Sequence, residues 1–262
     1  IRDPEMSRGL GDVYKRQPQG GPLSPLLSNI MLNELDKELE RRGHPFVRYA
    51  DDSMIFCKSK RAARRVKESI TRFIEGNLYL KVNKEKTVVS YVRGVKYLGY
   101  SFYVMKGKCR LTVHPKSKSK MKLRLKELTN RSNGWGYVKR KQKLKDYIRG
   151  WIGYYHLADM KRFLLDTDEW LRRRIRMCIW KAWKKPKTKV ANLIKCGIEK
   201  YKAWEWGNTR KGYWRIADSP ILKVAINNDS LRKAGYYTLM GSYLEWHPKI
   251  GTAVCRTART VV

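Results

Sequence analysis

Acidic residues are scarce in this chain. Its 262 residues include 23 Asp and Glu against 59 Lys and Arg, which gives a formal net charge of +36. An ordinary cytosolic enzyme does not need such an excess, which indicates a polyanionic partner, most simply a nucleic acid. Solvation alone does not explain it, because the usual protein surface intersperses charges of both signs.

Cysteines and long apolar runs are also in short supply. The five cysteines are scattered at positions 57, 109, 178, 196 and 255, without a Cys-x-x-Cys pair. This pattern argues against a zinc site or a disulfide framework and favours a reducing compartment. No run approaches the roughly 20 apolar residues that a membrane-spanning helix needs.

Aromatic residues, by contrast, are plentiful. Nine Trp and sixteen Tyr provide flat faces that can fill a core or stack on nucleic-acid bases. With 42% hydrophobic residues the chain can bury a core, and its length allows one or two domains.

A pair of adjacent carboxylates, Asp51 and Asp52, follows the strand-like run Phe-Val-Arg-Tyr-Ala. Alternation along a strand places Arg48 on one side and Tyr49 and Asp51 on the other. The aliphatic flanks predict a buried β-hairpin with the two carboxylates at its tip. Such a pair is costly near a core unless a cation is bound, and hard oxygen ligands suit Mg²⁺ and phosphoryl chemistry. A solvated Asp-Asp turn is the alternative, since aspartate is common in turns.

Residues 17–114 alternate between helical and extended patterns. One helix is expected from Ser24, as its N-cap, to Gly43, and another from Lys60 to about Phe73, before Gly76. Short strands are expected at Leu78–Val82, Thr87–Val92, Val95–Met105 and Cys109–His114.

The following residues read as basic helices. Between residues 106 and 162 there are 18 Lys and Arg against 3 Asp and Glu. Three stripes recur at helical spacing, namely Met121, Leu125 and Leu128; Leu144, Ile148, Trp151, Ile152 and Tyr155; and Leu171, Ile175, Cys178, Ile179 and Ala182. We interpret their aromatic residues as core. The segment Trp204–Arg215 mixes aromatics, cations and glycines, which suits unstacked RNA bases or, alternatively, a tightly packed turn.

Several segments, in order, resemble motifs of reverse transcriptases. The resemblance to motif B lies in Pro18-Gln19-Gly20-Gly21 with Ser24–Asn29, and the resemblance to motif C lies in Tyr49-Ala50-Asp51-Asp52. The resemblance to motif D lies in Asn83-Lys84-Glu85-Lys86-Thr87, and that to the primer-grip motif E in Tyr97-Leu98-Gly99-Tyr100. Residues 150–155, 173–181 and 207–215 resemble the thumb and maturase-specific X domain of group II intron-encoded proteins.

The resemblance implies an α+β fold, in which a partial reverse-transcriptase palm, an antiparallel sheet with helices, precedes an all-helical thumb and maturase domain. Its expected divisions are a partial palm at 17–114, a helical thumb at 115–185, a maturase-specific X region at 186–247 and a tail at 248–262. Residues 1–16 match nothing in the family pattern and are interpreted as an unassigned, non-native leader.

The resemblance also implies site residues. Asp51 and Asp52 would be catalytic and hold Mg²⁺, as part of a two-metal site that polymerisation needs. The nucleotide and template would lie near Gln19, Gly20, Gly21, Tyr49, Ala50 and Lys86. The primer grip would comprise Leu98, Gly99 and Tyr100. Intron RNA would contact Lys139, Arg140, Lys141, Arg173, Arg174, Arg210 and Lys211.

The chain departs from the family pattern before motif B. No segment resembles the fingers or the motif A strand, which carries a further metal-binding aspartate; Asp3 and Asp12 lack its setting. We therefore expect an RNA-directed DNA polymerase and maturase fragment, concerned with intron splicing and retrohoming, that is inactive alone as a polymerase. An RNA-binding splicing cofactor or a non-functional fragment are the alternatives.

The resemblance also names partners and a location. Group II intron RNA, a DNA primer or target and deoxynucleoside triphosphates are the expected partners. A homodimer is compatible with the pattern, and no membrane is expected. The expected location is the bacterial cytoplasm, in association with RNA or the nucleoid.

Overall fold

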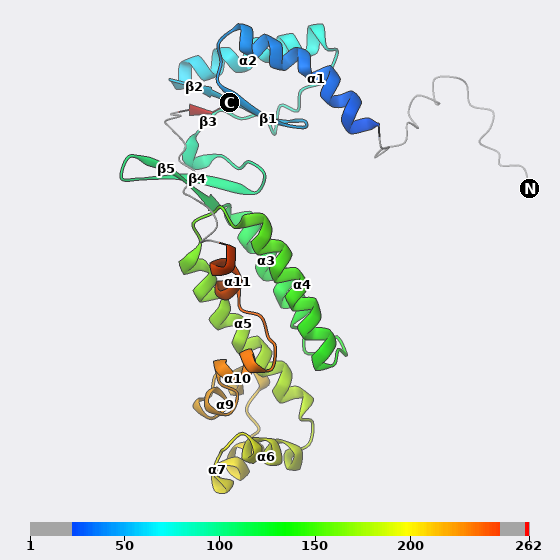
Figure 1. Ribbon diagram of the computed structural model, residues 1–262, viewed down its shortest axis with the longest axis vertical. Coiled ribbons are helices and arrows are strands. Elements are labelled where there is room, and N and C mark those ends of the chain that lie inside the picture. Colours follow the sequence, from blue (N-terminus) through cyan, green and yellow to red (C-terminus); the bar gives the residue numbers. More distant parts are fainter. Residues whose placement is uncertain (1–22, 247–259, 262) are drawn as a thin grey trace, which may run out of the picture. The chain divides into compact units, whose positions relative to one another are not determined.

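The structure is a computed structural model that describes residues 23–246, 260 and 261 (Figure 1). The chain divides into two compact units, a first unit of residues 1–95 with 257–262 and a second unit of residues 96–256. Helices and small antiparallel sheets together confirm the α+β class. The hairpin that the sequence analysis grouped with the palm, residues 100–113, lies in the second unit.

The first unit combines two helices with a small antiparallel sheet. Its elements are α1 (Ser24–Arg41), β1 (Phe46–Tyr49), β2 (Asp52–Cys57), α2 (Lys60–Asn77), β3 (Ser90–Tyr91), a 3-10 turn (Val92–Gly94) and β6 (Thr260–Val261). The strand order is β1-β2-β6-β3, and each neighbouring pair is antiparallel. The buried core of this unit consists of Leu35, Leu39, Ile55, Ile70 and Leu78.

Both predicted helices of this unit are present, with different ends. Ser24 is the first helical residue of α1 rather than its N-cap, and the preceding residue, Leu23, makes no side-chain cap. Helix α2 is capped by Ser59, whose hydroxyl accepts the Ala62 amide at 3.2 Å. It continues through Asn77, so a glycine near the end did not stop it. The apolar stripe of α2 packs on the core, which outweighs the helix propensity of one residue.

The expected strand at Leu78–Val82 is absent from the described structure, and the one at Thr87–Val92 is reduced to β3. Leu78 is buried and Leu80 packs on the core, so their alternation reflects burial of a loop. The Asn83 side chain accepts the amides of Glu85 and Lys86 at 3.1 Å. This local turn competes with strand pairing.

The second unit begins with a hairpin and continues as helices. Its elements are β4 (Tyr100–Met105), β5 (Lys108–Val113), α3 (Pro115–Leu128), α4 (Tyr137–Tyr155), α5 (Lys161–Ala182), α6 (Pro186–Lys195), α7 (Lys200–Gly207), α8 (Tyr213–Ile216), α9 (Pro220–Ala225), α10 (Asn228–Lys233) and α11 (Leu239–Trp246). Helices α3, α4 and α5 carry the three predicted stripes, and α11 packs against α4 and α5 (Figure 1).

Most residues of the three stripes belong to one buried cluster of this unit, whereas Cys178 lies in a smaller cluster with Met177 and Ala217. Met121, Leu144 and Leu171 are each 1% exposed or less. Trp151 and Tyr155 are partly buried against the same core, which agrees with their interpretation as packing residues. Ala182 lies on the exposed side and is an exception among the stripe residues.

A buried carboxylate attaches the last helix of this unit. Asp168 of α5 is 2% exposed and accepts the backbone amides of Leu239 at 2.8 Å and Met240 at 2.9 Å. These amides belong to the first turn of α11, where helical N–H groups have no partner within the helix. Burial raises the pKa of Asp168 above its usual range.

Two further segments of the second unit take part in short helices. Pro186 occupies the first turn of α6, after the break that ends α5, because proline fits a first helical turn. The aromatic segment Trp204–Arg215 forms the end of α7, a short turn and α8. Among the helices that the structure describes, none is both long and apolar enough to cross a membrane.

Candidate functional site

The carboxylate turn, residues Tyr49–Asp52, joins β1 to β2. The antiparallel ladder runs from Phe46 opposite Ile55 to Tyr49 opposite Asp52, so Ala50 and Asp51 form the tip. Ala50 has φ of 53°, in the left-handed region that is costly for a residue other than glycine. Asp51 and Asp52 are exposed, as in the alternative of a solvated Asp-Asp turn.

Strand β1 is the more open strand of this hairpin. Tyr49 is 65% exposed and Val47 is also exposed, whereas Met54 and Ile55 of the opposite strand are buried. The predicted burial of the hairpin therefore holds only for part of β2, whereas β1 is half-buried to exposed. Only part of the hairpin packs on the unit core, because the apolar residues of β1 alternate between its two faces.

Arg48 connects the turn to helix α1. Its Nε donates to Asp36 Oδ1 at 2.8 Å, and its Nη1 donates to Asn29 Oδ1 and to the Ala50 carbonyl, both at 2.9 Å. Sequence reasoning missed this arrangement. The available signal was that Asn29 and Asp36 stand two helical turns apart on one face of a predicted helix.

The carboxylate turn offers the oxygen donors that divalent ions such as Mg²⁺ prefer. Mg²⁺ commonly uses one or two protein carboxylates and keeps several waters, so Asp51 and Asp52 fit one ion. In the described ranges, 23–246 and 260–261, no group of three or more His, Cys, Asp or Glu gathers as a metal site. The described residues therefore offer two adjacent carboxylates rather than a closed cage.

Of the other predicted nucleotide residues, Gln19, Gly20 and Gly21 lie outside the described residues. Lys86 is exposed on the Asn83–Thr87 turn, where its amide is bound by the Asn83 side chain at 3.1 Å. A cationic side chain is thus held on a defined loop of the first unit.

The grip turn, residues Tyr97–Tyr100, is built into the second unit. Leu98 and Gly99 have φ of 49° and 81°, and Tyr97 and Tyr100 exchange backbone hydrogen bonds at 3.1 and 2.8 Å. This tight turn explains why the strand expected from Val95 begins only at Tyr100.

Helices α3 and α4 hold the grip turn from outside. The Gly99 carbonyl accepts from the Ser117 hydroxyl at 3.0 Å, and the Leu98 carbonyl accepts from the Tyr154 hydroxyl at 2.9 Å. The Tyr100 ring packs against Tyr154 and Tyr155, with centroids 6.0 and 5.2 Å away. Burial raises the pKa of Tyr100 to about 12, and its hydroxyl donates to the Tyr154 carbonyl.

The predicted RNA-contact cations on α4 have different surroundings. Lys139 is exposed and its ammonium lies 5.7 Å from the Trp135 ring centroid. Lys141 donates to the Ala234 carbonyl at 2.8 Å. Arg140 is only 5% exposed, and its Nη2 donates to Asn133 at 3.2 Å. Three neighbouring positive residues therefore divide between the surface and the interior.

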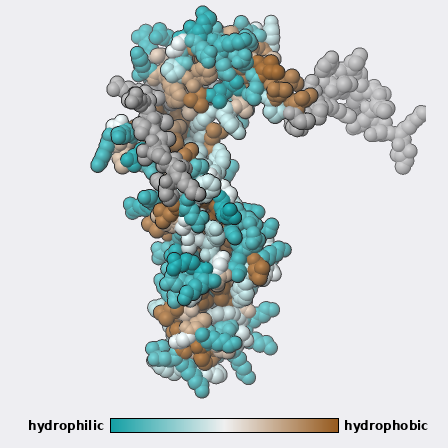
Figure 2. Space-filling model, viewed as in Figure 1, coloured by the Kyte–Doolittle hydropathy of each residue, from teal (hydrophilic) through white to brown (hydrophobic). Residues whose placement is uncertain are grey.

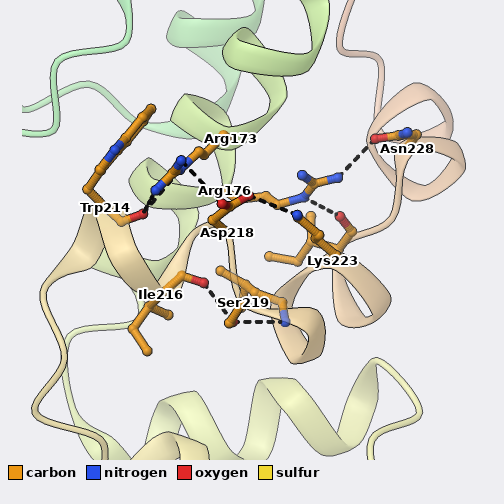
Figure 3. A network of polar contacts seen from close by, with 10 residues as sticks. Arg173, Arg176, Trp214, Ile216, Asp218, Ser219, Lys223 and Asn228 are labelled. Atoms are coloured by element: carbon orange, nitrogen blue, oxygen red, sulfur yellow. Dashed lines mark hydrogen bonds and ion pairs between the residues drawn. The ribbon is translucent and has the colours of Figure 1, made fainter.

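Arg173 and Arg176 of α5 belong to a polar network with the segment from Trp214 to Asn228 (Figure 3). The Arg173 guanidinium lies 4.0 Å from the Trp214 ring centroid and donates to the Trp214 carbonyl at 3.0 Å. It also pairs with Asp218 at 3.2 Å. Arg176 donates to the Ile226 carbonyl at 2.8 Å and to Asn228 at 2.9 Å. This network attaches the later short helices to α5.

Arg174 is engaged within the same unit. Its Nε donates to the Thr129 hydroxyl at 2.6 Å, and its Nη2 donates to the Lys126 carbonyl at 3.0 Å. Its guanidinium also lies 5.2 Å from the Trp170 ring centroid. This side chain joins the end of α3 to α5.

The remaining predicted contacts, Arg210 and Lys211, are exposed on the turn between α7 and α8. The Lys211 ammonium lies 4.9 Å from the Trp206 ring centroid. Sequence reasoning missed Arg131, whose guanidinium lies 5.0 Å from the ring of the exposed Tyr213. No sequence spacing could have paired them, because they are far apart in the chain.

Two family models match the chain. The model described as reverse transcriptase (RNA-dependent DNA polymerase) matches residues 9–102. The model of the group II intron maturase-specific domain matches residues 118–197. The first match covers the segments that resemble motifs B to E, but it begins at residue 9, so residues 9–16, interpreted above as a leader, match the family model. The second match covers residues 150–155 and 173–181, whereas residues 207–215 lie outside it.

Curated relatives are similar over part of the chain. Protein YkfC of Escherichia coli (strain K12) is 31% identical, over 32% of this chain and 31% of its own length. Group II intron-encoded protein LtrA of Lactococcus lactis subsp. cremoris is 27% identical, over 35% and 26% respectively. The Retron Mx65 reverse transcriptase of Myxococcus xanthus is 37% identical, over 27% and 17%. The chain thus spans less than a third of the length of these relatives.

Proposed function

We propose that this chain, which belongs to the family of group II intron-encoded reverse transcriptases and maturases, binds intron RNA through its second unit. Its first unit carries one part of the catalytic site of an RNA-directed DNA polymerase. The parent activity would serve splicing and retrohoming in the bacterial cytoplasm, with a DNA primer and deoxynucleoside triphosphates as further partners.

The observation that carries RNA binding is the association of exposed rings with cations in the second unit. Trp214, Tyr213 and Tyr201 are exposed, and each has a Lys or Arg group within 4.0 to 5.2 Å of its ring centroid. Unstacked RNA bases bind on aromatic and guanidinium planes, and their phosphates need cations. The exposed rings supply such planes, and the net charge of +36 reflects an excess of the cations.

The carboxylate turn supports the polymerase part of the proposal. When bound, Mg²⁺ would activate a primer hydroxyl and stabilise the charge of the leaving pyrophosphate. Asp51 would be a direct ligand, with Asp52 beside it. Tyr49 and Ala50 would lie near the primer end and Lys86 near the triphosphate. The grip turn would contact the primer backbone.

We further propose that the 262-residue chain does not extend primers by itself. Its sequence offers no counterpart of the motif A aspartate, and one carboxylate pair does not hold two ions in the usual way. Magnesium-dependent primer extension by the purified chain would refute this part. A role as an RNA-binding splicing cofactor alone is the second candidate, favoured by the larger core of the second unit.

Salt-dependent RNA binding tests the main proposal. Affinity for a labelled group II intron transcript would be measured between about 50 and 200 mM salt, with polyuridine of equal length as comparison. We expect a steep loss of affinity with salt. The charge reversals Lys139→Glu and Lys211→Glu should together reduce the log–log slope by about 0.7–0.9 for each RNA phosphate that the variant no longer neutralises.

Two matched variants sharpen this experiment. Asp51→Ala should leave RNA affinity nearly unchanged, although in a full-length parent it should abolish DNA synthesis. Arg140→Gln changes a buried cation beside Lys139 and should lower stability without changing the salt slope. A weak salt dependence, or an unchanged affinity in the charge-reversal variant, would contradict RNA binding by this surface.

A further inference from the structure

We propose that Arg48 is a positioning residue for the carboxylate turn. Its guanidinium ties the peptide before Asp51 to helix α1 and so fixes the backbone from which the Asp51 and Asp52 carboxylates project. The inference rests on the proposed role of these carboxylates in binding a divalent ion.

The guanidinium uses its whole fork of donors in this connection. Nε and Nη2 both donate to the Asp36 carboxylate, the Nε contact being 2.8 Å. Nη1 donates at 2.9 Å to Asn29 Oδ1 and to the Ala50 carbonyl. One planar group therefore joins two positions on α1 to the tip of the hairpin.

Helix α1 is a firm anchor at this point. Asp36 directly follows Leu35, which is 3% exposed, and precedes Leu39, which is fully buried. The side chains of Arg48 and Asp36 are themselves only 14% and 20% exposed. A shielded, bidentate ion pair is stronger and more precisely oriented than a solvated one.

The turn needs such support. Ala50 has φ of 53°, a conformation that costs a residue with a Cβ about 1–2 kcal/mol. Unlike asparagine or aspartate, alanine has no side chain that could stabilise a left-handed turn by a local hydrogen bond. The Arg48 bond to the Ala50 carbonyl restrains the peptide plane that leads into Asp51.

Only arginine suits this position. The guanidinium presents its donors in a fixed plane, whereas a lysine ammonium is a compact charge on a flexible stem. Arg48→Lys would keep the positive charge near the carboxylates and lose the planar fork. The substitution therefore separates positioning from simple charge compensation.

The test compares backbone mobility in the wild-type chain and in Arg48→Lys by ¹⁵N relaxation. We expect the order parameters of Ala50, Asp51 and Asp52 to fall from about 0.85 toward about 0.6 in the variant. Those of the β2 residues Met54–Cys57 should stay unchanged, which shows that the hairpin remains folded. Asn29→Ala, which removes one exposed acceptor, should give a smaller change at the same residues.

Arg42→Lys is the matched control. Arg42 directly follows the last residue of α1. Like Arg48 it forms a shielded pair, with Glu38 at 2.8 Å, and it also donates to the Ser69 hydroxyl of α2 at 2.6 Å. It does not contact the turn, so its replacement should leave the order parameters of Ala50–Asp52 unchanged. If Arg48→Lys and Asn29→Ala both leave turn mobility as it is in the wild type, or if Arg42→Lys mobilises the turn equally, the proposal is wrong.

Manganese binding gives an independent readout and separates the two proposals. Mn²⁺ affinity, followed by electron paramagnetic resonance, should fall in Arg48→Lys by up to about tenfold, the lower end for residues that orient metal ligands. Asp51→Ala should abolish this binding. If Asp51→Ala binds Mn²⁺ like the wild type, the ion-binding function fails. If Asp51→Ala abolishes Mn²⁺ binding but Arg48→Lys changes neither the mobility of the turn nor the Mn²⁺ affinity, the positioning role fails and the proposed function stands.

Discussion

The two units of this chain differ in how much apolar surface each buries. Among the described residues, the largest buried apolar cluster of the second unit comprises 25 residues, whereas that of the first unit comprises five. The first half of α1 illustrates the difference, since Leu23, Leu26, Leu27, Ile30 and Met31 are all at least 45% exposed. Figure 2 shows this apolar surface over the start of α1.

The two units also differ in how many contacts among the described residues hold their candidate sites in place. The helices of the second unit cover one another and hold the grip turn by several hydrogen bonds. In the first unit the carboxylate turn depends on a few polar contacts to α1, and helix α1 is only partly covered by described residues. This difference agrees with the proposal that the chain binds RNA through its second unit.

The largest expected effect tests the close packing of the second unit. Gly99→Ala should destabilise it by about 4 kcal/mol, because a Cβ would overpack against the Tyr155 hydroxyl and Ser117 Oγ, and Gly99 has φ of 81°. Gly107→Ala also has a left-handed φ, 73°, but open space, and should cost about 1 kcal/mol. Urea denaturation measures both, and equal losses would disprove the packing argument.

A pair of substitutions on α1 tests the contrast within the first unit. Leu35→Ala should lower the free energy of unfolding by about 3 kcal/mol, since it leaves a cavity in a small core. Ile30→Ala, on the exposed side, should change it by about 0.5 kcal/mol or less. Thermal unfolding followed by circular dichroism would compare them. A large loss in Ile30→Ala would show that this face is covered in solution.

The smallest effect concerns the attachment of α11 in the second unit. Asp168→Ala should cost about 2 kcal/mol, because it leaves the Leu239 and Met240 amides without their acceptor. Since burial raises the folded-state pKa of Asp168, its stabilising contribution is greatest at low pH and is lost as pH rises through that pKa.

The stability of wild type relative to Asp168→Asn should therefore increase as pH is lowered from 7 toward about 4, near the unperturbed aspartate pKa. Measuring both proteins at each pH cancels the acid sensitivity of all other groups. A relative stability that instead decreases over this range would mean that the two amide hydrogen bonds outweigh burial.

Much of the fold followed from local patterns. The stripes of α3, α4 and α5 predicted helices whose apolar residues are buried, because helical spacing alone determines which residues share a face. The Asp51–Asp52 pair was predicted at a hairpin tip, and Asp51 lies there, with Asp52 as the first residue of β2, since alternation and turn chemistry act within a few residues. The strand expected at Leu78–Val82 failed because buried loops can show the same alternation.

The sequence by itself determined the α+β class, the basic character of the helical half and the family motifs, since each depends on composition or short-range spacing. Only the tertiary structure decided which cations face inward. Arg140 is buried while Lys139 is exposed, and Arg48 reaches from β1 to Asp36 and the turn. A guanidinium can satisfy interior carbonyls or exterior phosphates equally well, so its partner depends on which distant segments the fold brings together.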